Sequence, residues 1–487
     1  YTLHTLFPYT TLFRSDGIIA LNKETIEIHV DELKDTGFII ADEALDYKDD
    51  RLYNLPLKSL AKNIGNPKVF GNVALGALLK LFNLDLSFVE GLLKEIFKDE
   101  VAVQNFVAFE AGYKEVSSKY DLKANEKDQS ILINGNDAIA LGALAAGCTF
   151  YSAYPMTPST TIMDYLASKM KEAEIVVEQA EDEIAAINMA IGASYAGVRA
   201  MTGTSGGGYA LMVEAIGLSS MLEVPLVVAE IQRPGPTTGL PTRTEQADLK
   251  FVISGTPGEL PKMVIGLRDP QDCFYQTMRA FNLADKYQIP VIILGDQFLA
   301  DSLKTISPFD FKKIKIERHL SEDEYNGDKI YNRYEVTKSG VSPRITPGRI
   351  AGKTVLVDSD EHDETGHITE SAEVRVIMND KRLRKMESIK EDLLEPEYIG
   401  QEDIDTLLIG WGSLYGPIKE AIKLLNDKGK EKYGALVFGD VWPLPDSLLK
   451  QKTLKAKRVI NVEQNATGQL ALLIRENTGI QMDDSYL

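Results

Sequence analysis

The acid best placed for chemistry is Glu183, which opens a stretch of almost wholly small or apolar residues, 184–197. A carboxyl group that leads a buried helix loses solvation, and neighbouring acids oppose its ionisation, whereas the helix N-terminus favours it. Such a carboxyl suits proton exchange with a nitrogen of a bound ring. Glu178, Glu181 and Asp182 precede it, and the plainer interpretation is that these acids only offset a helix dipole.

A second polar turn is expected at residues 154–160, YPMTPST, where a strand ends. We expect Thr157 to cap a helix whose first residue is Pro158. Thr157 and Ser159 would then offer hydroxyl groups and helix amides to an anion. The alternative is a rigid helix start without a ligand.

A third loop, residues 229–248, is rich in proline and presents Arg233 and Arg243 among several threonines. Paired guanidinium and hydroxyl groups suit a small carboxylate. The alternative is a surface loop with solvated arginines.

Residues 203–207, GTSGG, match the G-x-S-x-G nucleophile elbow and lie between a predicted strand and a predicted helix. A serine hydrolase using Ser205 would need a later histidine, and His319, His362 and His367 are available. No acid partner or oxyanion hole can be placed, so this stays the weakest alternative. We favour glycines that let a ligand or a partner backbone approach closely.

Metal chemistry has little support in this chain. His362, Asp363, Glu364 and His367 have a spacing too general for a metal site, and we interpret this loop as structural or interface-forming. The two cysteines, Cys148 and Cys273, are too few for an iron–sulfur cluster and fit buried apolar positions. Low cysteine content also fits a reducing cytoplasm.

Bulk properties limit the partners. A formal charge of −19 over 487 residues opposes binding to nucleic acid or to an anionic membrane. No apolar run reaches the ~20 residues that cross a bilayer. We therefore expect a cytoplasmic protein that binds neither nucleic acid nor membrane.

The elements that must position these residues alternate regularly from residue 131 onward. Continuous apolar strands alternate with helices, which predicts an α/β fold with a doubly wound parallel sheet covered on both faces. The expected divisions are a non-native leader (1–15), a truncated α/β domain (16–115), a linker (116–130), the main sheet domain (131–304), an irregular charged connection (305–400) and a smaller α/β domain (401–487).

Four motifs in this order resemble the α subunits of 2-oxoacid:ferredoxin oxidoreductases, across roughly residues 130–475. They are YPMTPST, the helix that Glu183 opens, MTGTSGGGYALM and AEIQRPGPTTGLPT. Residues 16–115 resemble part of the γ domain that some members carry ahead of the α part. GWGSLYGPIKEAI and VEQNATGQLA resemble the transketolase-like C-terminal domain of the same proteins.

The resemblance implies roles for individual residues. In the wider thiamine-enzyme fold a catalytic glutamate opens a helix and a glycine follows nine positions on, which Glu183 and Gly192 match. The main domain would bind the pyrimidine half of thiamine diphosphate, and Glu183 would hydrogen-bond its ring. Thr157 and Arg233 would bind the substrate carboxylate. The remaining assignments are Thr242 near the reacting centre and Tyr154 and Pro155 in the pocket wall.

The resemblance also implies a partner. Family members hold the diphosphate and Mg²⁺ on a GDG sequence followed by Asn, which this chain lacks, as it lacks cluster ligands. A β subunit would supply both, with Mg²⁺ and a [4Fe–4S] cluster, in an (αβ)₂ assembly that uses coenzyme A as co-substrate and ferredoxin as electron acceptor. Asn465, Thr467 and Gln469 would lie at an interface or near coenzyme A.

The implied reaction is oxidative decarboxylation of a 2-oxoacid to acyl-CoA and carbon dioxide. We expect 2-oxoglutarate as substrate, with pyruvate or a branched-chain or aryl 2-oxoacid as alternatives. A non-catalytic scaffold subunit of the same fold is a further alternative.

Overall fold

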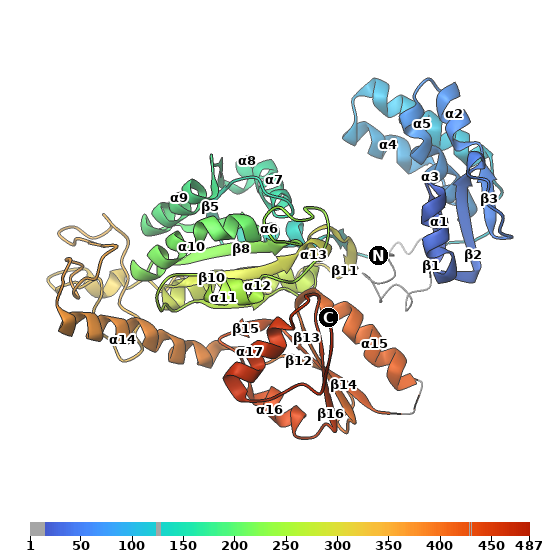
Figure 1. The fold of residues 1–487 in the computed structure, drawn as a ribbon. Coiled ribbons are helices and arrows are strands. Elements are labelled where there is room, and N and C mark those ends of the chain that lie inside the picture. Colours follow the sequence, from blue (N-terminus) through green and yellow to red (C-terminus); the bar gives the residue numbers. More distant parts are fainter. Residues whose placement is uncertain (1–14, 123–127, 428, 430) are drawn as a thin grey trace. The chain divides into compact units, whose positions relative to one another are not determined.

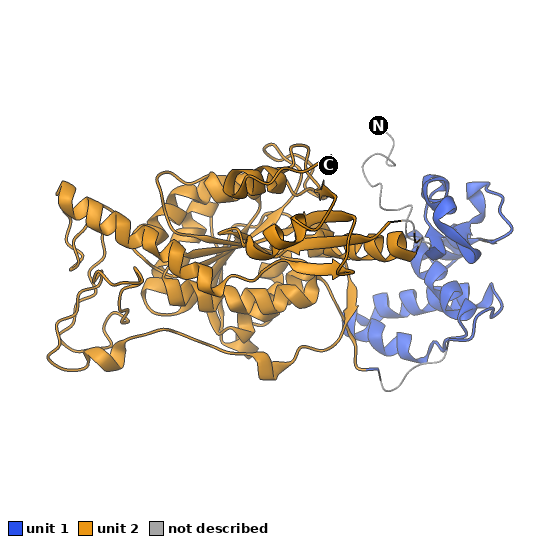
Figure 2. Ribbon diagram, turned by 90° about the horizontal axis from the view of Figure 1, so that it is seen from below, with its two compact units in different colours: residues 1–128 blue, residues 129–487 orange. Residues whose placement is uncertain are grey.

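The computed structural model describes residues 15–122, 128–427, 429 and 431–487, which belong to two compact units, 1–128 and 129–487 (Figure 2). Residues 1–14, where a non-native leader is predicted, and residues 123–127 of the predicted linker lie outside the described residues.

The first unit is a small α/β layer. Its parallel sheet has the order β1-β2-β3, and helices α3 and α5 pack so closely that a Cβ atom at Gly112 would overlap the Val73 carbonyl oxygen. Its elements are β1 (Ser15–Ala20), α1 (Lys23–His29), β2 (Leu33–Asp42), β3 (Leu52–Leu55), α2 (Leu57–Asn63), α3 (Phe70–Leu81), α4 (Ser87–Ile96) and α5 (Asp99–Lys114).

The second unit is built on a seven-stranded sheet of order β15-β9-β10-β8-β7-β5-β6, in which only β15 is antiparallel (Figure 1). The strands are β5 (Cys148–Ala153), β6 (Val176–Gln179), β7 (Arg199–Thr204), β8 (Leu226–Gln232), β9 (Met263–Gly266), β10 (Pro290–Asp296) and β15 (Asp440–Trp442). The predicted doubly wound parallel sheet is therefore confirmed.

Both faces of this sheet are covered. Along β8, Val227 and Ala229 enter a core with α6 and α12, whereas Val228 enters a second core with α9 and α10. Two buried faces explain why these strands are continuously apolar in the sequence. The helices are α6 (Gly135–Ala145), α7 (Thr160–Ser168), α8 (Met170–Ala173), α9 (Glu183–Tyr195), α10 (Gly206–Met221), α11 (Leu249–Ser254), α12 (Pro270–Tyr287) and α13 (Gln297–Asp301).

A smaller five-stranded sheet, of order β12-β14-β13-β16-β17, follows toward the C-terminus. It lies beside the β15 edge of the main sheet in Figure 1, and its buried side chains, Trp411 and Phe438 among them, share a core with α9 and α10. Its elements are β12 (Glu397–Gly400), β13 (Thr406–Trp411), α15 (Tyr415–Asp427), β14 (Tyr433–Phe438), α16 (Ser447–Thr453), β16 (Arg458–Val462), α17 (Gln469–Thr478) and β17 (Asp484–Tyr486). The short strands β4 (Ile131–Ile133) and β11 (Lys304–Ile306) pair with each other.

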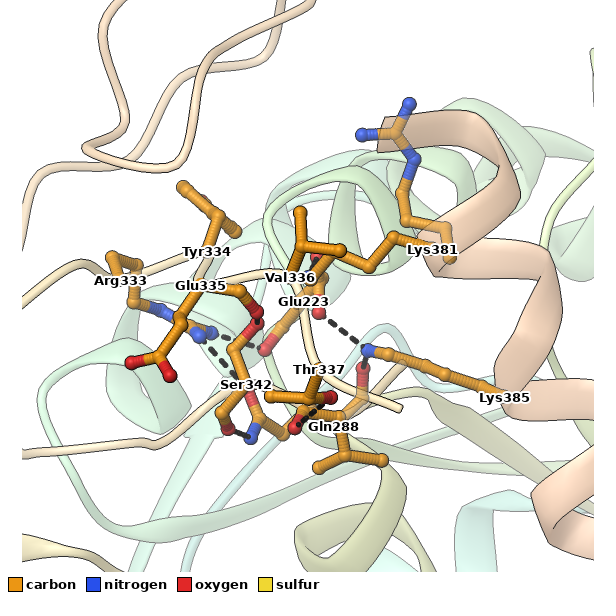
Figure 3. Close-up of polar contacts among 12 residues, drawn as sticks. Glu223, Gln288, Arg333, Tyr334, Glu335, Val336, Thr337, Ser342, Lys381 and Lys385 are labelled. Carbon is orange, nitrogen blue, oxygen red and sulfur yellow. Dashed lines mark hydrogen bonds and ion pairs between the residues drawn. The ribbon is translucent and has the colours of Figure 1, made fainter. Parts of the chain in front are cut away.

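The connection 305–400 is not irregular throughout, because it contains the 18-residue helix α14 (Ala372–Ile389). The sequence shows no apolar stripe there, since three of the buried side chains of α14 are Lys381, Arg382 and Lys385. Lys381 and Lys385 contact the two carboxylate oxygens of Glu223 at 2.5 and 2.6 Å (Figure 3). The helix is thus anchored by buried ion pairs, which hydrophobic periodicity does not reveal.

None of the described helices is both long enough and apolar enough to span a bilayer.

Candidate active site

The candidate residues gather at one edge of the main sheet. Tyr154 follows β5, Glu183 follows β6, Ser205 follows β7 and Arg233 follows β8. Because these four strands are parallel, their carboxyl ends meet at the same edge. This is where ligands bind in open α/β sheets.

Glu183 enters the interior, unlike the three acids that precede it, which are all exposed. Glu183 is only 4% exposed, and its Oε1 is buried without a hydrogen-bond partner in the described chain. Asp182 is the N-cap of α9, and its Oδ1 accepts from the Ala185 amide at 2.7 Å. Glu178 and Glu181 are exposed. A buried carboxylate oxygen without a donor is a position that a ligand N–H can satisfy.

The glycine-rich turn at the start of α10 leaves room for two acids. A Cβ atom at Gly208 would lie 2.6 Å from Glu183 Oε1 and 2.2 Å from Thr204 Oγ1, and one at Gly206 would lie 2.4 Å from Asp248 Oδ2. At Gly207 the nearest atom would be 3.8 Å away. The glycines were interpreted as space for a ligand or a partner backbone; at 206 and 208 that space is taken by side chains of the chain itself.

The loops that carry Thr157 and Arg233 meet. Arg233 Nη1 donates to the Thr157 carbonyl oxygen at 2.6 Å, whereas Arg233 Nε is buried without a partner. The prediction that Thr157 caps a helix with Pro158 at its first position is wrong. Helix α7 begins at Thr160 after Ser159, because residues 156–159 close a turn of their own in which Ser159 Oγ donates to the Met156 carbonyl at 2.8 Å.

Residues 154–157 lie over the end of β7. Met156 Sδ is 4.0 Å from Thr204 Oγ1, which places this turn beside the Glu183 position. Tyr154 is 39% exposed and Pro155 is half-buried, so both border open space. Thr242 is exposed and has no hydrogen bond to Glu183 or Arg233 in the described chain, so its assignment stays a prediction.

The far end of the 229–248 loop is held by the C-terminal sheet domain. The Gln464 carbonyl accepts from the Gln246 amide at 2.8 Å, and Asn465 Nδ2 donates to the Gln246 carbonyl at 3.1 Å. Gln469 accepts from the Lys250 amide at 2.9 Å and donates to the Ala247 carbonyl at 2.6 Å. Asn465 and Gln469 therefore position this loop, an interface within the chain itself.

Sequence reasoning missed three acids at the same edge: Glu230, Asp248 and Asp296. Burial raises the pKa of Glu230 well above its ordinary value, raises that of Asp248 to about 6 and also raises that of Asp296. A signal was present, since Glu230 and Asp296 interrupt the apolar runs PLVVAEI and PVIILGD.

The structure gives the serine hydrolase no triad. Ser205 Oγ is buried and has no hydrogen-bond partner, histidine included, among the described residues. His362 packs on the Tyr334 ring with centroids 3.9 Å apart. In the described part of the chain, no group of three or more His, Cys, Asp or Glu side chains is arranged to hold a metal ion. Cys148 and Cys273 are buried, and burial raises the pKa of Cys148 to about 12.

The arrangement fits thiamine diphosphate on its pyrimidine side. The unpartnered Glu183 oxygen can accept a hydrogen bond from the protonated ring nitrogen. The residues of the turn at 154–157 are exposed or half-buried, so this side of the site is accessible to a ligand. A doubly wound parallel sheet with this site at its carboxyl edge fits a thiamine-diphosphate-binding domain.

Comparison with known proteins identifies the family. Residues 141–381 match the family described as pyruvate flavodoxin/ferredoxin oxidoreductase, thiamine diphosphate-binding, and residues 10–115 match the family described as pyruvate ferredoxin/flavodoxin oxidoreductase. The 2-oxoacid:ferredoxin oxidoreductase 1 subunit alpha of Sulfurisphaera tokodaii is 36% identical over 427 residues, 84% of this chain and 67% of the relative. The chain thus spans about two thirds of that relative's length.

Two further matches agree. The 2-oxoglutarate synthase subunit KorA of Methanocaldococcus jannaschii is 36% identical over 342 residues, 68% of this chain and 88% of the relative. A structure of 2-oxoglutarate:ferredoxin oxidoreductase from Magnetococcus marinus with 2-oxoglutarate, coenzyme A and succinyl-CoA bound has 35% identity and a TM-score of 0.86, over 97% of this chain and 84% of that chain. The chain therefore belongs to the family of 2-oxoacid:ferredoxin oxidoreductase α subunits, which confirms the resemblance inferred from its motifs.

Proposed function

We propose that this α subunit takes part in the oxidative decarboxylation of 2-oxoglutarate to an acyl-CoA, with Glu183 as the proton-exchanging group. The observation that supports the proposal is the Glu183 carboxyl group, buried to 4% exposure with one oxygen lacking any partner in the described chain. Buried acids without cations are costly, so they are retained mainly where they act.

The chain's own residues would divide the work as follows. Thiamine diphosphate, when bound, supplies the carbon nucleophile that attacks the 2-oxo group and accepts the electron pair released on decarboxylation. Glu183 holds and returns a proton at the pyrimidine ring nitrogen. Arg233 and Thr157, already in contact, orient the carboxylate that leaves as carbon dioxide. Tyr154 and Pro155 form part of the pocket wall, and Thr242 approaches the reacting centre from its loop.

An exposed apolar face beside Glu183 supports a partner subunit. On α9, Ile184 and Met189 are 50% and 43% exposed, and on α10 Leu211 is 50% exposed. Gly192, eight residues after Ile184 on α9, is also exposed, and a Cβ atom there would meet no described atom within 4 Å. The Glu183 helix, predicted to be buried, therefore packs one face into the core and leaves the other exposed. Apolar patches rimmed by polar residues commonly mark protein interfaces.

We infer that a β subunit covers this face and supplies the diphosphate half of the site with Mg²⁺ and a [4Fe–4S] cluster. An (αβ)₂ assembly would then transfer electrons to ferredoxin and the acyl group to coenzyme A. The names of the relatives support 2-oxoglutarate: one is a 2-oxoglutarate synthase subunit, and the Magnetococcus marinus enzyme was solved with 2-oxoglutarate bound.

The test is to produce the chain with its β subunit and to assay coenzyme-A-dependent viologen reduction with 2-oxoglutarate, pyruvate and a branched-chain 2-oxoacid. We expect the highest kcat/KM with 2-oxoglutarate. Glu183→Gln should lower kcat by ~10²–10⁴-fold, because a positioned proton-transfer group is lost. Glu181→Gln, an exposed acid two residues away, is the matched control and should leave kcat unchanged.

Each alternative has its own result in this experiment. A higher kcat/KM with pyruvate or a branched-chain acid would change the assigned substrate but not the assigned site. A complex that assembles with β but shows no turnover and no response to Glu183→Gln would indicate a scaffold. Labelling of Ser205 by a fluorophosphonate would indicate a hydrolase.

A further inference from the structure

The loop that carries Arg233 and Thr242 ends at a buried glutamine, Gln246. This residue is fully buried, although it lies only four positions after the exposed Thr242. The loop is held at its beginning by the contact of Arg233 described above, and in its middle the Leu240 amide donates to the Pro234 carbonyl at 3.0 Å. The position of its other end therefore depends on what Gln246 contacts.

Every donor group of Gln246 is used. Its Nε2 donates to Asp296 Oδ2 at 2.9 Å and to Ser413 Oγ at 3.2 Å, and Ser413 Oγ donates to the same Asp296 oxygen. Its backbone amide donates to the Gln464 carbonyl at 2.8 Å, and its carbonyl accepts from Asn465 Nδ2 at 3.1 Å. Asp296 ends strand β10 of the main sheet, whereas the other three residues belong to the C-terminal domain. Gln246 thus joins the two sheets.

The side-chain amide of Gln246 has one suitable orientation. Asp296 Oδ1 accepts from the Leu299 amide at 3.0 Å, and its Oδ2 accepts from the Ser413 hydroxyl, so this carboxyl group acts as an acceptor. The opposite orientation would set Oε1 of Gln246 against it and turn Nε2 toward a place where Oε1 now has no partner in the described chain. Position 246 therefore needs a donor of this length, which an apolar side chain cannot provide.

The groups that the C-terminal domain offers to Gln246 are fixed by that domain itself. Asn465 Nδ2 also donates to the buried Glu463 Oε2 at 2.8 Å, and the Glu463 carboxylate accepts from two backbone amides at the beginning of α17 at 2.9 and 3.1 Å. Gly412 has a φ of 59°, and a Cβ atom there would lie 3.0 Å from Gln246 Nε2. The turn that presents Ser413 therefore needs a glycine.

We propose that Gln246 is a positioning residue for the 2-oxoacid: it fixes the end of the loop and so holds Thr242 and its neighbours where they meet the substrate. The C-terminal domain carries none of the residues assigned to the 2-oxoacid, yet through Gln246 it sets the affinity for it. The inference rests on the proposed function, because it takes Arg233 and Thr242 as substrate-binding residues. The proton exchange of Glu183 does not depend on it.

The test is steady-state kinetics of variants of the αβ complex. Gln246→Ala should raise the KM for 2-oxoglutarate by ~10-fold or more, because a hydrogen bond to a charged group is lost at the end of the loop. Exchange of the C2 proton of bound thiamine diphosphate should keep its wild-type rate, since it needs no substrate. Gln451→Glu, exposed on α16 of the C-terminal domain, is the control and should leave both quantities unchanged.

A pair of substitutions separates positioning from loss of folding. Gln246→Glu keeps the length of the side chain but removes the donor, so it should raise the KM as well. Combining it with Asp296→Asn exchanges donor and acceptor, because the new amide at 296 can donate to the new carboxylate at 246. Asparagine also caps helices, so the contact of position 296 with the first turn of α13 is kept. The double variant should return the KM to near the wild-type value.

Hydrogen exchange of residues 234–245, followed by mass spectrometry, reports on the loop without activity. It should be faster in Gln246→Ala than in the wild type and in Gln451→Glu. A wild-type KM in both single variants, or a raised KM that the double variant does not lower, overturns the inference. Slower C2 exchange in Gln246→Ala also overturns it, because the cofactor site would then have moved.

The outcome is separable from that of the proposed function. A complex that turns over 2-oxoacids with a wild-type KM in the Gln246 variants loses this inference alone. A wild-type complex that turns over no 2-oxoacid loses the proposed function, and unchanged hydrogen exchange of residues 234–245 in Gln246→Ala would then overturn the role of Gln246 independently.

Discussion

Buried acids lie at both edges of the main sheet, but the acids described at the amino edge are paired with cations, whereas Glu183 and Glu230 at the carboxyl edge are not. At the amino edge, Asp285 contacts Arg199, Arg318 and Arg344 at 2.8, 3.1 and 2.6 Å, and Glu223 contacts two lysines. At the carboxyl edge, Glu183 and Glu230 have oxygens with no donor in the described chain.

The difference separates acids that stabilise the fold from acids that are available for chemistry. The cations at the amino edge come largely from the 305–400 segment, so their ion pairs attach that segment to the sheet. Arg333, for example, donates to the Glu223 carbonyl at 2.6 Å (Figure 3). At the carboxyl edge no cation among the described residues forms an ion pair with Glu183 or Glu230, which leaves these acids available for proton transfer.

The largest effect, on stability, should follow from removing an ion-paired acid at the amino edge of the main sheet. Glu223→Ala leaves Lys381 and Lys385 buried without a counter-ion, so the free energy of unfolding should fall by about 3–5 kcal/mol. Urea denaturation would measure it, with Glu214→Ala, exposed on α10, expected within about 0.5 kcal/mol of the wild type. Equal stability of both variants would mean that these ion pairs do not hold the segment.

A second substitution tests the carboxyl edge of the main sheet without replacing an acid. Gly208→Ala places a methyl group against Glu183 Oε1 and Thr204 Oγ1, and a displacement of about 1 Å at a reacting group can cost ~10²-fold in kcat. Gly207→Ala meets only the Thr237 carbonyl at 3.8 Å and should keep its activity. Steady-state kinetics of the two αβ complexes would decide. Similar kinetics in both would show that the space at Gly208 is not needed.

The smallest effect concerns stability against pH. The pKa of Asp248, ordinarily 3.8, is raised to about 6, so the folded chain binds more protons than the unfolded chain between these values. The contribution of Asp248 to stability therefore falls as pH rises through this window. In the wild type, Asp248 should lower the free energy of unfolding by about 1 kcal/mol or more between pH 4 and 6. Asp248→Asn should remove this decrease, which urea titrations at each pH would measure. An unchanged slope would indicate that Asp248 is already ionised in the folded chain.

The sequence was sufficient for the sheet and for part of the site. Continuous apolar strands predicted the parallel sheet, and the small residues after Glu183 predicted that its carboxyl group enters the core. Helix α14 could not be found, because Lys381 and Lys385 are buried by pairing with Glu223, more than 150 residues away in sequence. The burial of Asp248 was likewise hidden, since it depends on how the C-terminal domain holds residues 246–250.

The most direct test of Glu183 is the exchange rate of the thiazolium C2 proton of thiamine diphosphate for deuterium in the αβ complex, followed by acid quench and proton NMR. This step precedes substrate chemistry, so it reports the proton-transfer role alone. We predict that Glu183→Gln slows the exchange by ~10²–10⁴-fold while thiamine diphosphate still binds, and that Glu181→Gln exchanges at the wild-type rate. Wild-type exchange in a cofactor-saturated Glu183→Gln complex would contradict the account.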